Sequence, residues 1–186
     1  MTAVIINMLW LRPGQVGGSE TYAVQLLAAL SQNPEAPPIE LALTPATYQA
    51  YQFLDQAFEI NQQQPPPGRI GRIFKENRLF GHLGNEHLIH HLGGTIPKRE
   101  NSAQKVVTIY DAQYREYPQY FSFTKRRYLD IAIQRTLQQA ETVCVISDFC
   151  AQSLEKTFGK MKQIKNVVID LINGNVKLTL NKKNDL

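Results

Sequence analysis

Long apolar runs are absent from this chain of 186 residues. No segment approaches the roughly 18–20 consecutive apolar residues that a membrane-spanning helix needs. The first ten residues also lack a basic stretch and a small-residue cleavage site, so we expect a first strand there and not a signal peptide. A cytoplasmic protein is therefore expected, free or at the inner membrane surface.

Cysteine and net charge are also scarce. Cys144 and Cys150 are too few for the disulfide framework of a secreted domain, and we expect both to be reduced thiols in the core. The 20 basic and 16 acidic residues give a net charge of +4, which is too mild to indicate nucleic-acid binding. A composition with 43% hydrophobic and 19% charged residues is that of a globular protein, and the length fits one domain.

Short β-branched runs alternate with helical patterns along the chain. The expected strands are Ala3–Met8, Ile39–Thr44, Leu88–Leu92, Lys105–Tyr110 and Thr142–Ile146. The expected helices are Ser19–Gln32, Thr47–Ile60, Arg69–Leu83, Thr124–Ala140 and Asp148–Phe158, with Ser147 as a cap. This alternation predicts an α/β fold, a single Rossmann-like domain with a mainly parallel sheet. Ligands bind such sheets at the carboxyl ends of the strands. The loops of interest are therefore Leu9–Gly18, Gly93–Pro97, Asp111–Phe121 and Ser147–Phe149.

Glycines gather in the loop before the first helix, at Gly14, Gly17 and Gly18. They allow close approach of the backbone to a ligand, and the helix start behind them favours an anion or a sugar phosphate. Their spacing is neither G-x-G-x-x-G nor that of a P-loop, so the dinucleotide and P-loop interpretations lose support. The alternatives are a purely structural turn and a surface Glu20 that complements the helix dipole.

Candidate side chains for a site follow the later strands. Asp111 comes directly after Lys105–Tyr110 and could accept hydrogen bonds from sugar hydroxyls, or could instead cap a turn or a helix. The histidines form no H-E-x-x-H motif, and we expect no metal site. His90 and His91 are neighbours in a strand and should point to opposite faces, with His90 directed into a cleft.

One expected helix is basic on part of its surface. Its basic residues recur every three positions, at Arg69, Arg72, Lys75 and Arg78. Such a helix can lie on an anionic membrane, and the alternative is a solvated face on a helix that covers part of the core.

Two blocks of the sequence resemble the N-terminal domain of the retaining GT-B glycosyltransferases of family four. The first block is Val16–Leu30, with its Gly-Gly-x-Glu loop and helix. The second joins Ile89–Pro97, Val107–Tyr114, Tyr117–Ser122, Lys125–Tyr128 and Ala140–Phe149 in the order that the family shows. The match spans most of residues 1–160, which we expect to form the N-terminal, acceptor-side half of a GT-B fold.

The resemblance implies a role for several residues. Gly17 and Gly18 would approach the acceptor and the donor phosphates, with Glu20 in the same loop. His90 and Thr95 would face the cleft, and Ser147 would end a strand beside it. Asp111 matches the Asp of the family's His-Asp pair and is the candidate catalytic residue. In the full family a nucleotide diphosphate sugar is the co-substrate, and no bound cofactor is expected.

The chain departs from the family in two places. Tyr110 stands where the family has the His of the pair. If the reaction needs that His side chain, this chain has lost it; if only the backbone matters, the change is tolerated. The Glu-(seven residues)-Glu element of the donor domain is also missing, so we expect that the C-terminal donor domain is absent.

Residues 161–186 read as a divergent tail at the interdomain crossover. Val167–Ile172 and Asn175–Leu180 flank Asn173-Gly174, which is a strong turn signal. We expect a hairpin there, in place of the missing domain.

The leading hypothesis is the acceptor-side half of a retaining glycosyltransferase, of mannosyl- or glucosyl-type, that is inactive alone. Its partners would be an acceptor glycan or glycolipid and a separate donor-domain chain, with peripheral membrane contact through the basic helix. One alternative is a non-catalytic module, derived from a truncated glycosyltransferase, that binds a glycan or a partner chain. Another is a nucleotide-binding Rossmann protein of a different kind.

Overall fold

The structure is a computed structural model that describes residues 3–98, 102–159, 164–170 and 175–179. Its strands are β1 (Ala3–Asn7), β2 (Ile39–Leu43), β3 (Glu59–Gln62), β4 (His87–His91), β5 (Gln104–Ile109), β6 (Thr142–Val145), β7 (Ile164–Asp170) and β8 (Asn175–Thr179). Its α-helices are α1 (Gly18–Ser31), α2 (Pro45–Ala50), α3 (Gly68–Phe80), α4 (Gln113–Glu116), α5 (Phe123–Gln139) and α6 (Asp148–Phe158). Two short 3₁₀ helices are η1 (Gln52–Gln56) and η2 (Pro118–Tyr120).

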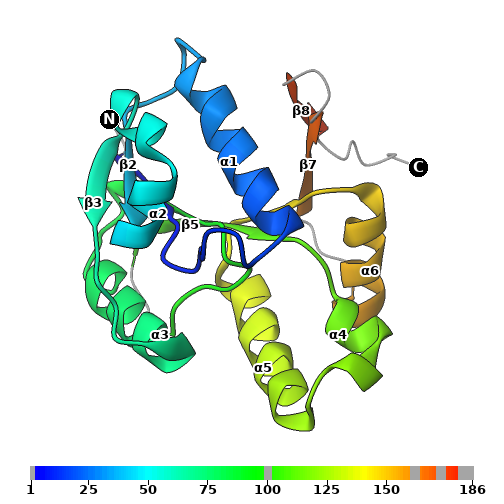
Figure 1. Cartoon of the computed structure of the whole chain (residues 1–186). Helices are drawn as coiled ribbons and strands as arrows, with labels where there is room; N and C mark the ends of the chain where they lie inside the picture. Colours follow the sequence, from blue (N-terminus) through cyan, green and yellow to red (C-terminus); the bar gives the residue numbers. More distant parts are fainter. Residues whose placement is uncertain (1–2, 99–101, 160–163, 171–174, 180–186) are drawn as a thin grey trace.

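All these strands join one sheet in the order β3-β2-β1-β4-β5-β6-β7-β8. Neighbouring strands are parallel except β7 and β8, which are antiparallel. The chain first builds outward from β1 to β3 and then from β4 to β8, so the two outer strands β3 and β8 lie far apart (Figure 1). The order therefore reverses between β1 and β4, which is where doubly wound sheets bind their ligands. The α/β fold with a mainly parallel sheet is confirmed.

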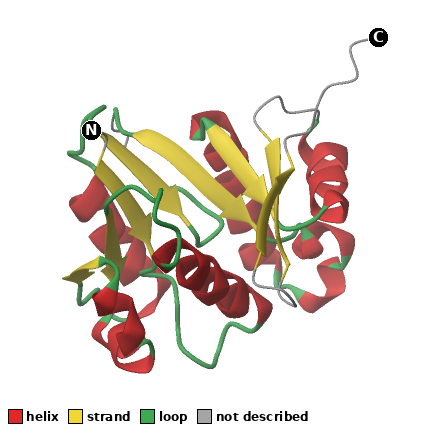
Figure 2. Ribbon diagram, turned by 90° about the horizontal axis from the view of Figure 1, so that it is seen from above, coloured by secondary structure: helices red, strands yellow, loops and turns green. Residues whose placement is uncertain are grey.

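Helices cover both faces of this sheet (Figure 2). Leu27 of α1 and Leu54 of η1 pack against Ile6 on one face. Phe80 of α3 packs on the opposite face against Ile5 and Ile89. Burial of alternate residues of β1 against different helices explains why Ala3–Ile6 is continuously apolar.

The second half of the sheet has its own core. Val107 and Val143 pack with Ile133 of α5 and Leu154 of α6. The cysteines of β6 and α6, Cys144 and Cys150, are both buried and are not joined in a disulfide, as expected. Among the described residues, no helix combines the length and apolar character needed to cross a bilayer.

The ends of α6 follow from its flanking residues. Ser147 is extended and its hydroxyl accepts a hydrogen bond from the Cys150 N–H at 3.2 Å, which satisfies one of the free N–H groups of the first turn. Gly159 ends the helix with φ of 90°, a left-handed conformation that favours glycine. The predicted bounds of this helix are confirmed.

The prediction of one helix over Thr47–Ile60 is wrong. α2 ends at Ala50, Tyr51 leaves the helical region with φ of −133°, and η1 and then β3 follow. β3 pairs in parallel with β2, with Ile60 opposite Leu41. It is an outer strand with a half-exposed, polar sequence, so it lacks the apolar run that marks the inner strands.

The strands β7 and β8 continue the sheet beyond β6. β7 is parallel to β6, and β8 returns antiparallel with Asn175 opposite Asp170. Residues 171–174, where we expect the turn, lie outside the described residues, so the hairpin turn stays a prediction. The boundary near residue 160 likewise stays a prediction.

Candidate functional site

The loops after β1, β2, β3, β4 and β5 enclose a hollow that we call the carboxyl-edge cavity. Its volume is about 810 Å³, which is within the usual range of small-molecule pockets. Its lining comes from residues 9–13, 15–16 and 19 after β1, 44–46 after β2, 64–69 and 72 after β3, 93 after β4 and 110 after β5. The cavity therefore lies at the switch point of the sheet, as the parallel fold predicts.

Two aromatic rings form part of the wall of this cavity. The ring centroids of Trp10 and Tyr110 are 6.0 Å apart, and Tyr22 of α1 contacts Tyr110 edge-on at 5.6 Å. Gly93 makes this packing possible, because an added Cβ there would lie 2.8 Å from the Trp10 ring. Aromatic faces of this kind suit the apolar face of a sugar ring.

Tyr110 stands where the resembling family has a His. Its hydroxyl is buried and has no hydrogen-bond partner among the described residues. Burial raises its pKa, with a smaller contribution from Tyr22. The phenol is therefore neutral at neutral pH, and it cannot act there as a general base. What Tyr110 supplies at this position is a ring surface.

The glycine loop has the backbone that its sequence predicts. Gly14 and Gly17 have φ of 73° and 62°, and Gly17 is the residue before α1. The Ser19 hydroxyl donates to the Val16 carbonyl at 2.9 Å, which closes the turn. Gly18 faces open space, since an added Cβ would meet nothing within 4 Å. The loop thus presents the N-terminus of α1 at the carboxyl edge of the sheet.

Glu20 is buried instead of lying on the surface. Both of its carboxylate oxygens accept from the Gly14 N–H, at 2.9 and 3.0 Å, and its Oε1 also accepts from the Tyr51 hydroxyl. These hydrogen bonds, with Tyr51 the larger cause, lower the pKa of Glu20. The carboxylate therefore ties the glycine loop to the segment after α2, and a direct contact with substrate stays a prediction.

Asp111 and its neighbours border two smaller hollows. One, of about 160 Å³, is lined by Thr95, Asp111 and Tyr110 among others, and a second, of about 600 Å³, by Gly18, Asp111 and Tyr110 among others. The structure thus brings Gly18, Thr95 and Asp111 around Tyr110. The Asp111 carboxylate is exposed and accepts from the Gln113 N–H at 3.0 Å, which is the turn that we gave as an alternative to a ligand contact.

His90 and Ser147 are engaged within the fold. The His90 Nε2 lies 2.8 Å from the Thr108 hydroxyl on β5, and burial lowers the pKa of His90 to about 4. The Ser147 hydroxyl caps α6, and it donates to the Cys150 Sγ at 3.2 Å. Roles for these two residues toward a ligand stay predictions, since each already has a structural partner.

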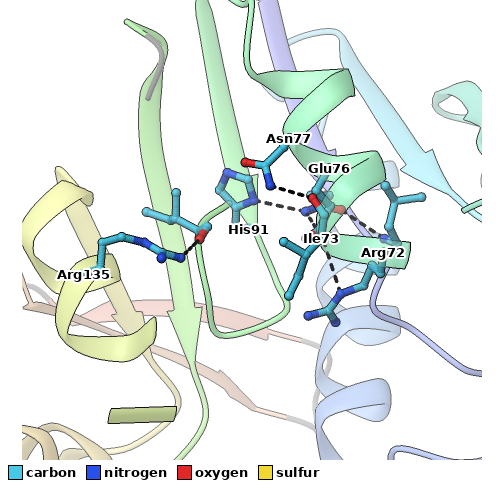
Figure 3. A network of polar contacts seen from close by, with 9 residues as sticks. Arg72, Ile73, Glu76, Asn77, His91 and Arg135 are labelled. Carbon is cyan, nitrogen blue, oxygen red and sulfur yellow. Dashed lines mark hydrogen bonds and ion pairs between the residues drawn. The ribbon is translucent and has the colours of Figure 1, made fainter. Parts of the chain in front are cut away.

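A buried polar network lies between the ends of β1 and β4 and α3 (Figure 3). The Asn7 amide donates to Glu76 Oε1 at 3.0 Å and lies 3.1 Å from His91 Nδ1, while its oxygen accepts from the Leu9 N–H. Glu76 also pairs with Arg72, whose Nε is 3.7 Å from Oε1. Because Arg72 lines the carboxyl-edge cavity, the network joins the wall of the cavity to the sheet.

Much of the wall of the carboxyl-edge cavity lies outside the loops predicted from the sequence. Its members after β3 include the three prolines Pro65, Pro66 and Pro67 and the arginines Arg69 and Arg72. The predicted helix Thr47–Ile60 overlaps the first two residues of β3, so the sequence predicts no strand there and does not place the following loop at the carboxyl edge. A strand assignment for Glu59–Gln62 would have placed it there. The described residues contain no group of three or more His, Cys, Asp or Glu side chains suited to a metal ion.

Solved structures share this fold. The chain is similar to the Anabaena protein Alr3699/HepE in complex with UDP and glucose, at 17% identity and a TM-score of 0.55. It is similar to the same protein in complex with UDP-glucose at 15% identity, also with a TM-score of 0.55. Each alignment covers 90% of this chain and 44% of the other, so this chain spans less than half the length of that protein. No family model and no curated protein matches the sequence. The fold is that of one Rossmann-like half of a GT-B protein.

Proposed function

We propose that this chain is the acceptor-side half of a glycosyltransferase. The observation that carries the proposal is the carboxyl-edge cavity, at the switch point of a sheet that matches proteins seen with UDP-glucose. The reaction is transfer of a glucosyl- or mannosyl-type sugar, with retention, from a nucleotide diphosphate sugar to an acceptor hydroxyl. The acceptor is a glycan or glycolipid whose sugar packs against Trp10 and Tyr110.

The same face approaches the donor in this proposal. As the glycosidic bond to the donor breaks, negative charge develops on the departing diphosphate. The start of α1 at Gly17 and Gly18 offers N–H groups and the positive end of the helix dipole to that charge. Asp111, exposed beside Gly18 in the hollow they share, accepts a hydrogen bond from a sugar hydroxyl. The nucleotide itself is held by a second half, in a further segment or a separate chain.

A transfer assay tests the proposal. Two proteins are compared: the purified chain alone, and the chain fused to the part of HepE beyond the matched region. Each is incubated with radiolabelled UDP-glucose or GDP-mannose and a set of oligosaccharides. We expect no turnover by the chain alone, because Gly17 and Gly18 supply a small part of the charge stabilisation that the reaction needs. Transfer by the joined protein, abolished by Asp111→Asn, supports the proposal. Robust turnover by the chain alone contradicts it.

A second candidate is a glycan-binding module without catalysis. Tyr110 favours this module. In the resembling family the position holds the His of the His-Asp pair, which can exchange a proton near pH 7, whereas the phenol of Tyr110 stays neutral there. Saturable binding of an oligosaccharide, with no transfer in either form of the protein, would favour this module over the enzyme half.

We also propose that α3 contacts an anionic membrane surface. Ile70 and Phe74 lie one turn apart on this helix and are 85% and 64% exposed, with the exposed Arg69 and Arg78 beside them. Basic and apolar side chains in this arrangement suit the interface of a charged bilayer. Ile70→Ser with Phe74→Ser should weaken co-sedimentation with phosphatidylglycerol vesicles by about tenfold, since two apolar side chains no longer enter the interface.

The matched control for this membrane test lies on α5. Ile131 and Phe123 are 62% and 68% exposed, and their replacement by serine removes similar apolar surface from another face. The control variant should bind vesicles as the parent does. Equal loss in both variants, or no loss in either, contradicts membrane contact through α3.

A further inference from the structure

The carboxyl-edge cavity is lined by side chains of one charge. Arg12 follows β1, and Arg69 and Arg72 lie in the first turns of α3, while no aspartate or glutamate is among the lining residues. Within the described part of the chain, Arg12 and Arg69 form no ion pair. Arg72 is partly compensated by Glu76 at 3.7 Å. The cavity therefore has an excess of positive charge.

The walls of the cavity hold two of these arginines in place. Gly71 packs directly on the proline segment, since an added Cβ would lie 2.2 Å from the Pro66 carbonyl oxygen. The Arg69 guanidinium lies 5.0 Å from the centre of the Tyr128 ring, and Arg72 joins the Asn7 network. A hollow with charges of one sign concentrates the field within it and attracts ligands of the opposite sign.

We propose that Arg12, Arg69 and Arg72 bind a phosphate group of the acceptor in the carboxyl-edge cavity. The guanidinium group donates two parallel hydrogen bonds to phosphate or carboxylate. A phosphate monoester fits the excess of charge better than a carboxylate, because the monoester carries about −1.5 to −2 at pH 7 and the carboxylate −1. The inference rests on the proposed function and names the acceptor class: a sugar that carries a phosphate monoester, or a lipid headgroup that ends in one.

Trp10 is the single tryptophan of the chain and lines the same cavity, so its fluorescence reports binding there. The probe is glucose 1-phosphate, compared with the neutral methyl glucoside. We expect saturable quenching by glucose 1-phosphate, at least about tenfold weaker binding of methyl glucoside, and affinity that falls as salt is added. The double variant Arg12→Gln with Arg69→Gln should raise the Kd of glucose 1-phosphate at least about tenfold.

The matched control removes the same charge elsewhere. Arg78 on α3 and Arg127 on α5 are exposed and do not line the cavity, so Arg78→Gln with Arg127→Gln should change the Kd less than about threefold. Equal weakening in both double variants would mean a general surface charge effect and would overturn the proposal. Arg12 and Arg69 are exposed, and circular dichroism of each variant checks that the fold is kept.

A second titration separates the two sources of phosphate. If glucose 1-phosphate gives no response but phosphatidic acid vesicles do, with loss in Arg12→Gln and not in Arg127→Gln, the group belongs to a lipid and the proposal stands. No response to either phosphate source overturns it. Binding of methyl glucoside as tight as that of glucose 1-phosphate also overturns it, yet leaves the acceptor-side function intact. Phosphate binding without any transfer in the joined protein would support the phosphate site and contradict the acceptor-side function.

Discussion

Asn7→Ala is expected to lower the free energy of unfolding by about 2–4 kcal/mol. Asn7 is 1% exposed, and its amide makes contacts with Glu76, His91 and the Leu9 N–H at 3.0 to 3.1 Å. Alanine would leave buried polar groups of three chain segments without these partners, and each such group costs about 1–3 kcal/mol. Urea unfolding followed by circular dichroism measures the change.

The control for this variant is Asn33→Ala. Asn33 is exposed after α1 and its side chain accepts one hydrogen bond, from the Glu35 N–H, so its loss should cost less than about 0.5 kcal/mol. If Asn7→Ala costs no more than this control, the network does not hold the end of β1 to α3 and β4. The cavity wall at Arg72 would then lack the support that we assign to it.

Mild acid is expected to destabilise the fold strongly, by about 3 kcal/mol between pH 7 and pH 4.5. Burial lowers the pKa of His90 to about 4 and that of His91 to about 3. Both side chains stay neutral in the folded chain at a pH where they are protonated in the unfolded chain, since an ordinary His has a pKa of about 6.5. Below about pH 6.5 the unfolded state therefore binds more protons than the folded state does. The stability is at its highest above that pH and is lost as the pH falls below it.

Glu76 acts in the opposite sense and reduces the effect. Burial raises its pKa, so the folded chain takes up this proton before the unfolded chain does. Urea unfolding at a series of pH values measures the sum, and NMR titration of the two imidazoles separates the contributions. Either imidazole titrating near pH 6.5 in the folded protein, or a stability that is flat from pH 7 to 4.5, contradicts the burial described for these histidines.

The elements with strong local signals were predictable from the sequence. Ala3–Ile6 of β1 and Val143–Val145 of β6 are continuous apolar runs because they lie in the interior of the sheet, and the bounds of α6 follow from Ser147 and Gly159. The prediction of one helix over residues 47–60 was wrong because the sequence signals for its end and for the next strand are weak. Tyr51 breaks α2 with no glycine or proline to mark the break, and β3 is a short polar strand at the edge of the sheet.

The site was predictable in place but not in composition. Parallel strands put the loops after β1, β4 and β5 at one edge, which brought Gly18, Thr95 and Asp111 into the predicted region. The contact of Gly93 with Trp10, and the hydrogen bond that buries Glu20 against Tyr51, depend on packing between distant segments. Local sequence carries no signal for such contacts.

The central claim is that the carboxyl edge of this sheet holds the acceptor and not the nucleotide. NMR mapping of backbone amide shifts, with sugar phosphates and oligosaccharides on one side and UDP-glucose on the other, tests it most directly. We expect saturable shifts in residues 10–19, 93–95 and 110–111 with an acceptor-type sugar, and weaker binding of UDP-glucose. Tighter binding of UDP-glucose at this edge, or acceptor shifts confined to other faces, would contradict it.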